Sequence, residues 1–343
     1  MSSAEPPQII PARVHPALML SRHMAFVCAA LTIAVLPLVF TDTYWRTICT
    51  VCALNVALAI GLDFVLGYAG QLNLGQSAFY GLGAYASTLL VTKLGIPFWV
   101  ALTGAIALSC LAGAVLALFA MRLRGHYLAI ASLGFAVITY QILLNWISLT
   151  QGPLGIYAIP PPPAIVLPGL PAIDFHNLGN LFYLVAAFAL LSYRLLDQLI
   201  RSPIGEALIA IREDEVSAAS LGINCGVWKV FAFAVSSGIA GAAGCLYASV
   251  VGTLVPDAFF MTESFTILAM VVVGGTGTLV GPVCGAILLT VLPEFLRGIG
   301  DLRLLIYGIA LTLVVFFMPG GIVQAARLAS GRLQRMALRR TAR

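Results

Sequence analysis

Charged residues are scarce in this chain. Of its 343 residues, only 18 are Lys or Arg and 13 are Asp or Glu, which together make 9% of the sequence. A soluble domain of this length needs far more charge to cover its surface, so the scarcity excludes an ordinary soluble protein. Hydrophobic residues make up 61% of the chain, and the mean hydropathy is +1.02. We therefore expect an all-α, polytopic membrane protein.

Lysine and histidine are rarer still. Neither of the two lysines, Lys93 and Lys229, follows a glycine in a G-x-x-x-x-G-K-[ST] pattern, so the chain lacks a Walker-type ATP site of its own. The four histidines are scattered over tails and loops: His15, His23, His126 and His176. Because no acids, bases or metal ligands converge in the sequence, a membrane-embedded enzyme is disfavoured. We expect no catalytic residue, no metal site and no cofactor.

Apolar runs of about 20 residues, enough to cross ~30 Å of hydrocarbon, recur along most of the chain. They predict about ten transmembrane helices, at 24–40, 46–66, 76–93, 97–121, 126–146, 180–196, 228–252, 263–275, 279–296 and 302–318. The predicted organisation is an N-terminal tail (1–23), a transmembrane domain (24–321) and a basic C-terminal tail (322–343).

The basic residues are distributed unevenly over the two sides of this predicted topology. With a cytoplasmic N-terminus, fourteen of the 18 Lys and Arg residues lie on the inner side, and the outer side holds Arg46, Lys93, Arg297 and Arg303. This bias predicts that both termini are cytoplasmic. Since the basic residues fall in short loops and a tail beside the lipid bilayer, they do not indicate nucleic-acid binding.

Two predicted spans are interrupted by glycines. Residues 66–85 read LGYAGQLNLGQSAFYGLGAY, and residues 273–285 read VGGTGTLVGPVCG. Broken helices expose backbone polar groups, which are tolerated at membrane depth only where protein or a water-filled cavity covers them. Close helix packing through small residues is the alternative, but it does not explain the polar side chains between the glycines. The predicted translocation pathway comprises Gly70, Gln71, Asn73, Gln76, Ser77, Gly274, Gly275 and Gly277.

Asp63 is the one carboxylate well inside a predicted span. Acids within the membrane are costly and suggest a function by default. This one lies near the cytoplasmic end of its helix, where we expect water to reach it, and no partner base is evident. A structural or pore-mouth role is therefore favoured over a proton relay.

The segment 201–229, RSPIGEALIAIREDEVSAASLGINCGVWK, is an exception to the apolar character of the chain. Five of the thirteen acids lie between Asp197 and Glu215. Apolar residues at helical spacing predict one amphipathic helix ending near Gly222: Ile204, Leu208, Ile211, Ala218 and Leu221. Its acids disfavour a place on anionic lipid headgroups, so we expect it to dock onto a partner protein.

Five segments resemble one family in sequence and in order. They are the two glycine-rich runs, the second extended to MVVVGGTGTLVGPVCGAILLTVLPEFLR (270–297), together with LRGHYLAIASLGF (123–135), LTQGPLGI (149–156) and RSPIGEALIAIREDEVSAASLGI (201–223). These segments are similar to the permease subunits of branched-chain amino-acid ABC transporters, more to the LivM type than to the LivH type. The resemblance covers about residues 46–321. In two respects the chain departs from the family pattern: Gln76 stands where a histidine is expected, and the predicted outer loop 147–179 carries an unusual run of prolines, Pro160 to Pro163.

The resemblance implies a subunit of an ATP-driven importer in the bacterial inner membrane, working by alternating access. Its implied partners are a second, LivH-type permease, cytoplasmic ATP-binding subunits and a periplasmic substrate-binding protein. The implied cargo is leucine, isoleucine and valine; urea, amides or another small polar solute, and a secondary transporter or channel, stay open as alternatives. The resemblance also places the coupling to the ATPase in the Glu206–Gly222 region of the segment 201–229, at Glu206, Ala207, Leu208, Ile211, Arg212, Glu213, Asp214, Glu215, Leu221 and Gly222.

Overall fold

The computed structural model describes residues 42–120, 126–164 and 174–299, with 308, 312 and 320–323. All of these belong to the compact unit Asp42–Arg343. The N-terminal tail, most of the C-terminal tail and the predicted spans 24–40 and 302–318 lie outside the described residues, apart from residues 308 and 312.

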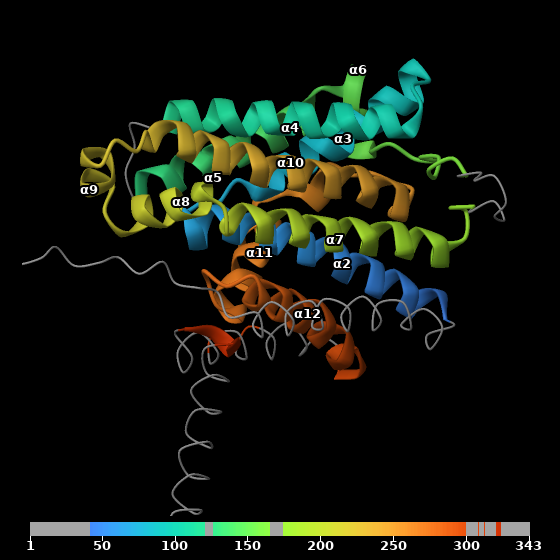
Figure 1. Ribbon diagram of the computed structural model, residues 1–343. Helices are drawn as coiled ribbons and strands as arrows, with labels where there is room; N and C mark the ends of the chain where they lie inside the picture. Colours follow the sequence, from blue (N-terminus) through green and yellow to red (C-terminus); the bar gives the residue numbers. More distant parts are fainter. Residues whose placement is uncertain are drawn as a thin grey trace, which may run out of the picture. The chain divides into compact units, whose positions relative to one another are not determined.

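The described part of the chain is helical and contains no strand; its one β-bridge joins Ile156 to Leu254. The expected all-α class is therefore confirmed for this part (Figure 1). The first half holds α2 (Thr43–Asp63), the π-helix η1 (Phe64–Tyr68), α3 (Gln76–Leu94), α4 (Phe98–Ala120), α5 (His126–Asn145), α6 (Ile147–Thr150) and the 3₁₀ turn η2 (Gly152–Leu154). The second half holds α7 (Leu178–Ile200), α8 (Pro203–Glu213), α9 (Glu215–Ser220), α10 (Cys225–Val251), the 3₁₀ turn η3 (Pro256–Phe259), α11 (Met261–Gly274), α12 (Val280–Phe295) and the 3₁₀ turn η4 (Leu296–Ile299).

Six of the described helical segments are long and apolar enough to cross a membrane. They are Thr43–Tyr68, Phe98–Phe119, Tyr127–Asn145, Leu178–Ile200, Cys225–Val251 and Pro256–Gly274. α3 and α12 occupy two further predicted spans, and α12 is a shorter apolar helix. The protein is thus a multi-pass helical membrane protein, while the count of ten spans stays a prediction.

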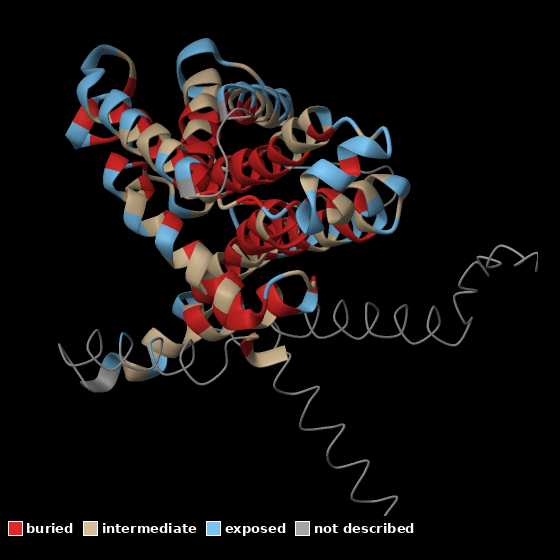
Figure 2. Ribbon diagram, turned by 90° about the vertical axis from the view of Figure 1, so that its left-hand side faces the viewer, coloured by how far each residue is buried: buried red, intermediate tan, exposed pale blue. Residues whose placement is uncertain are grey.

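α10 lies at the centre of the bundle, packed against α3, α4 and α2. In Figure 1 it runs between α4 and α7, and in Figure 2 buried residues fill the interior of the bundle. Its central position follows from the stretch Ser236 to Cys245, which is buried throughout and consists of small residues apart from Ile239. Gly241 lies against Gly83 of α3, and Gly244 lies against the Tyr80 carbonyl. Helices can approach this closely only where side chains are absent or small.

Basic residues lie at both ends of the bundle. α7 ends and α10 begins at the end that carries α8 and α9 (Figure 1). This α8–α9 end holds Arg201, Arg212 and Lys229. Near α6, Lys93 donates to the carbonyls of Ser148 and Leu149, each at 2.9 Å. This separation agrees with the predicted topology, whereas the assignment of the α8–α9 end to the cytoplasm stays a prediction.

Candidate functional site

The first glycine-interrupted segment begins where α2 widens into the π-helix η1. A π turn leaves carbonyls without their usual intrahelical partners, and such turns are frequent at functional sites. The chain then leaves the helix at Gly70, which has a left-handed φ of 66°. One carbonyl of η1, that of Gly67, accepts a 2.6 Å hydrogen bond from Nη1 of Arg212. A side chain of the charged α8–α9 end therefore reaches the broken end of α2.

The second glycine-interrupted segment meets the first at the same place. α11 ends at Gly274, and the chain turns through Gly275 (φ 114°) and Gly277 (φ 72°) before α12 begins. A Cβ at Gly67 would overlap the backbone of Gly277, so glycine is required for the two backbones to touch. Around this contact, which we term the glycine junction, lie Asp63, Gly67, Gly277 and Arg212.

Asp63 is a buried hydrogen-bond acceptor within the glycine junction. Its Oδ1 accepts a 2.9 Å hydrogen bond from the Gly277 amide, and its charge interacts electrostatically with Arg212. The side chain is 0% exposed, and Oδ2 has no hydrogen-bond partner within the described residues. The expectation that water reaches Asp63 is wrong, because η1 and the 275–277 turn enclose the end of α2. The geometry supports the structural role that the sequence favoured.

The charged segment differs from the single amphipathic helix that the sequence predicts. The structure divides it into α8 and α9 at Asp214, whose backbone is extended (φ −156°, ψ 111°). The Asp214 carboxylate caps α9 by accepting from the Val216 amide at 2.9 Å and from the Ser217 hydroxyl at 2.6 Å. Aspartate favours this capping conformation over a helix interior, which explains the break. The apolar stripe breaks with it, since Leu221 is 80% exposed.

Removing the α9 cap should loosen α9 selectively. We expect Asp214→Ala to speed amide hydrogen exchange at Val216 several-fold, because this amide loses its acceptor. Asp214→Asn is the matched control, since asparagine is an equally good cap without a titrating group. Equal exchange in the two variants would contradict the capping role.

The same cap predicts a pH dependence of α9. Hydrogen bonds from the Ser217 hydroxyl and the Val216 amide lower the pKa of Asp214 below its ordinary value. A pKa lowered by folding gives stability that is present above the ordinary Asp pKa and is lost as the pH falls through the lowered one. Protection of α9 should therefore decline in acid relative to Asp214→Asn at the same pH.

The predicted coupling residues form a mixed surface at the α8–α9 end. Leu208 and Ile211 are buried against the helix bundle, and Ala207 and Glu215 are half-buried. Glu215 also pairs with Lys229 at 2.7 Å, which ties α9 to the N-terminal part of α10. The remaining predicted residues are exposed: Glu206, Arg212, Glu213, Asp214, Leu221 and Gly222. Their role in coupling stays a prediction.

The polar residues of the predicted pathway lie deeper, at the N-terminus of α3. Asn73, Gln76 and Ser77 are buried there. Ser236 of α10 donates to Gln76 Oε1 at 3.4 Å, and Ser264 of α11 bonds both the amide (2.9 Å) and the hydroxyl (2.8 Å) of Ser77. We call these five residues the α3 polar cluster. Ser236 and Ser264 were not among the predicted pathway residues, because a single polar position within an apolar helix is the only sign of them in the sequence.

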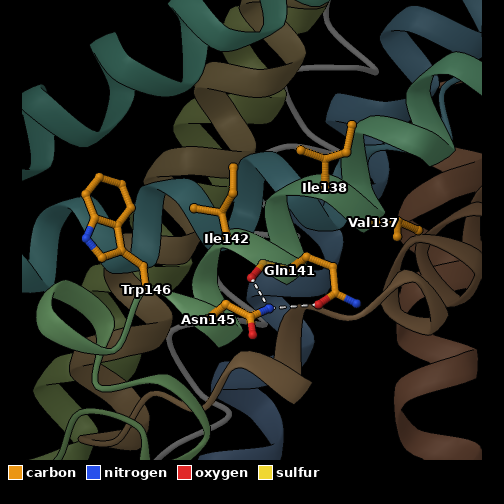
Figure 3. Close-up of a pocket in the computed structure, with 6 residues that line it drawn as sticks. All are labelled: Val137, Ile138, Gln141, Ile142, Asn145 and Trp146. Carbon is orange, nitrogen blue, oxygen red and sulfur yellow. Dashed lines mark hydrogen bonds between the residues drawn. The ribbon is translucent and has the colours of Figure 1, made fainter.

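A separate hollow lies on the outer surface of α5. It has a volume of about 550 Å³ and is lined by Val137, Ile138, Gln141, Ile142, Asn145 and Trp146 (Figure 3). Asn145 Nδ2 donates to the carbonyl and to Oε1 of Gln141, at 2.9 and 3.0 Å. No predicted pathway residue lines it. Gln71, Asn73, Gln76 and Ser77 are instead packed inside the protein.

Comparison with known proteins agrees with this architecture. The family model described as the permease component of branched-chain amino acid transport systems matches residues 44–318. The chain belongs to this family. The permease is 35% identical over 323 residues to the high-affinity branched-chain amino acid transport system permease protein LivM of Salmonella typhimurium, covering 89% of this chain and 76% of the relative.

Two relatives from Escherichia coli allow the similarity of this chain to the LivM and LivH types to be compared. LivM is 36% identical over 297 residues, covering 82% of this chain and 70% of the relative. LivH is 25% identical over 290 residues, covering 78% and 90%. No solved structure matches the permease. The stronger similarity to LivM confirms the resemblance drawn from the sequence motifs.

Proposed function

We propose that the permease is the membrane-spanning, LivM-type subunit of an ATP-binding-cassette importer that carries leucine, isoleucine and valine across the bacterial inner membrane. The identity of 35–36% to LivM proteins over most of the chain supports this assignment. The partners in the proposal are a LivH-type permease, cytoplasmic ATP-binding subunits and a periplasmic substrate-binding protein. In this arrangement about ten spans cross the membrane, and both termini and the α8–α9 end face the cytoplasm.

The surface of α8 and α9 is the proposed contact with the ATP-binding subunit. Val216 and Leu221 are 68% and 80% exposed although both are apolar, and the acids Glu206 and Glu213 of the same α8–α9 end are exposed as well. Exposed apolar side chains among exposed charges, at a polar end of a membrane protein, are typical of a protein contact. The acids favour a basic rim on the partner.

The hydrogen bond from Arg212 to Gly67 is the observation that carries the coupling proposal. It joins this exposed surface to the glycine junction, where both broken helices end. When the ATP-binding subunits move α8, Arg212 transmits the movement to η1 and to the 275–277 turn. Alternating access then consists of a change in how these two segments pack. Such coupling requires an element with two alternative packings whose balance is shifted from a distant site. Here the glycine junction is the element, and the α8–α9 surface is the site.

Uptake measurements test the substrate. Cells that lack this chain and regain it are supplied with labelled leucine, urea and short amides. We expect the chain to restore leucine uptake and to leave urea and amide uptake unchanged. Restored urea or amide uptake without leucine uptake would overturn the cargo and favour the alternative solutes. Leucine uptake that persists after the ATP-binding subunits are deleted would favour a secondary transporter.

A further inference from the structure

The orientation of the Gln76 side-chain amide is fixed by its neighbours. The Gly75 amide donates to Asn73 Oδ1 at 2.8 Å, so the Asn73 nitrogen must be the atom that faces Gln76. Asn73 Nδ2 then donates to Gln76 Oε1 at 3.2 Å. Since Oε1 is held on this side, the Nε2 group of Gln76 points to the other.

Nε2 of Gln76 is a buried donor without an acceptor. Gln76 is 0% exposed, and Nε2 has no hydrogen-bond partner in the part of the chain that the structure describes. Leaving a buried donor unpaired is costly, and each such group needs an explanation. A glutamine retained at this cost in an apolar bundle suggests that an acceptor arrives in another step of the cycle.

A small space beside Nε2 is left by Gly61 of α2. A Cβ built at Gly61 would lie 3.6 Å from Nε2 and 3.5 Å from Cγ2 of Ile239, which is ordinary van der Waals contact. The site is therefore enclosed by α2, α3 and α10, with room for about one methyl group in the closed packing seen here. Any larger group requires these helices to separate, as they do in alternating access.

The electrostatics of the site favour an anionic oxygen. Gln76 is the first residue of the 19-residue helix α3, and the N-terminus of a helix carries partial positive charge. The Ser77 hydroxyl of the same cluster accepts a hydrogen bond from Ser264, so its own proton can rotate to donate. A carboxylate offers enough lone pairs to accept from several of these donors at once.

We propose that Gln76 Nε2 and the N-terminal end of α3 bind the carboxylate of the transported amino acid as it passes through the permease. This inference rests on the proposed function, and it names one residue that contacts the solute. Ser236 and Asn73 hold the Gln76 amide in place through Oε1, while Nε2 meets the solute.

Two variants test the proposal in the full transporter, reconstituted with its ATP-binding subunits and binding protein. Gly61→Ala keeps Gln76 intact, adds only ordinary contacts and fills the space beside Nε2. Gln76→Glu keeps an acceptor for Asn73 and replaces the donor by a second oxygen that repels a carboxylate. We expect each to lower the initial rate of leucine uptake at least tenfold. The thermal unfolding midpoint of Gly61→Ala should stay at the wild-type value or above it.

Gly134→Ala is the matched control for Gly61→Ala. Gly134 lies within α5, and a Cβ there meets nothing within 4 Å. Its uptake should equal that of the wild type. If the wild-type transporter does not carry leucine, the proposed function fails. If the wild type carries leucine and both site variants keep at least half of its rate, the carboxylate site is overturned and the function stands.

Discussion

Arg212→Ala is expected to lower leucine uptake at least tenfold while leaving the transporter assembled. The guanidinium donates to the Gly67 carbonyl at 2.6 Å and also pairs with Glu213 at 2.7 Å. Hydrogen bonds that involve a charged group contribute about 1.5–3 kcal/mol. Because Arg212 is partly exposed, we take a value near the lower limit for its bond to Gly67. Losing that free energy shifts the equilibrium between the two packings of the glycine junction by about tenfold. We therefore expect at least a tenfold loss of uptake, measured in proteoliposomes alongside ATP hydrolysis and co-purification of the subunits.

Arg201→Ala is the matched control for Arg212→Ala. The two arginines lie at the same end of the bundle, and both side chains are 37% exposed. Arg201 differs in its partner, because it caps the C-terminus of α7 and bonds Asp197 of that helix, at 3.0 and 2.8 Å. Its loss should change uptake less than twofold. Arg212→Lys, which keeps the charge but lacks the planar fork, should be intermediate. Equal uptake by Arg212→Ala and Arg201→Ala would contradict the coupling role.

The glycine junction illustrates what the sequence can and cannot predict. The two glycine-rich runs are evident as interruptions of apolar spans, and each is a broken helix in the structure. The sequence does not reveal that Gly67 touches Gly277, or that Arg212 bonds a carbonyl 145 residues away. Such contacts depend on how the helices pack. A periodic pattern reports the buried face of a helix, but not the partner that covers it.

In the charged segment 201–229, the apolar periodicity predicts the wrong number of helices. Apolar spacing from Ile204 to Leu221 predicted one helix, because periodicity ignores how a side chain competes for the backbone. Asp214 in fact ends α8 and caps α9, which turns Leu221 outward. The capping preference of aspartate was available from the sequence and outweighs the stripe. By contrast, Ser236 was not predictable, since its role depends on contact with Gln76 of another helix.

Gly83→Ala is expected to destabilise the whole bundle. A Cβ at Gly83 would lie within 2.5 Å of three backbone atoms of Gly241. No rotamer change relieves an overlap with backbone, so α3 and α10 must move apart. Because α10 also packs against α4 and α2, the displacement spreads through the core. Overpacking costs about 1–3 kcal/mol and occasionally more, and we place this variant at or above the upper limit. Heating followed by size-exclusion chromatography in detergent measures the loss.

Gly134→Ala separates this steric effect from the general effect of alanine in a helix. The same substitution in α5 adds a methyl group that meets nothing within 4 Å. Alanine is the better helix former by about 1 kcal/mol, so this variant should unfold at the wild-type temperature or slightly above it. Opposite shifts for Gly83→Ala and Gly134→Ala would show that α3 and α10 depend on direct backbone contact. Shifts of the same sign and size would contradict it, because then the missing side chain of Gly83 would serve no purpose in packing.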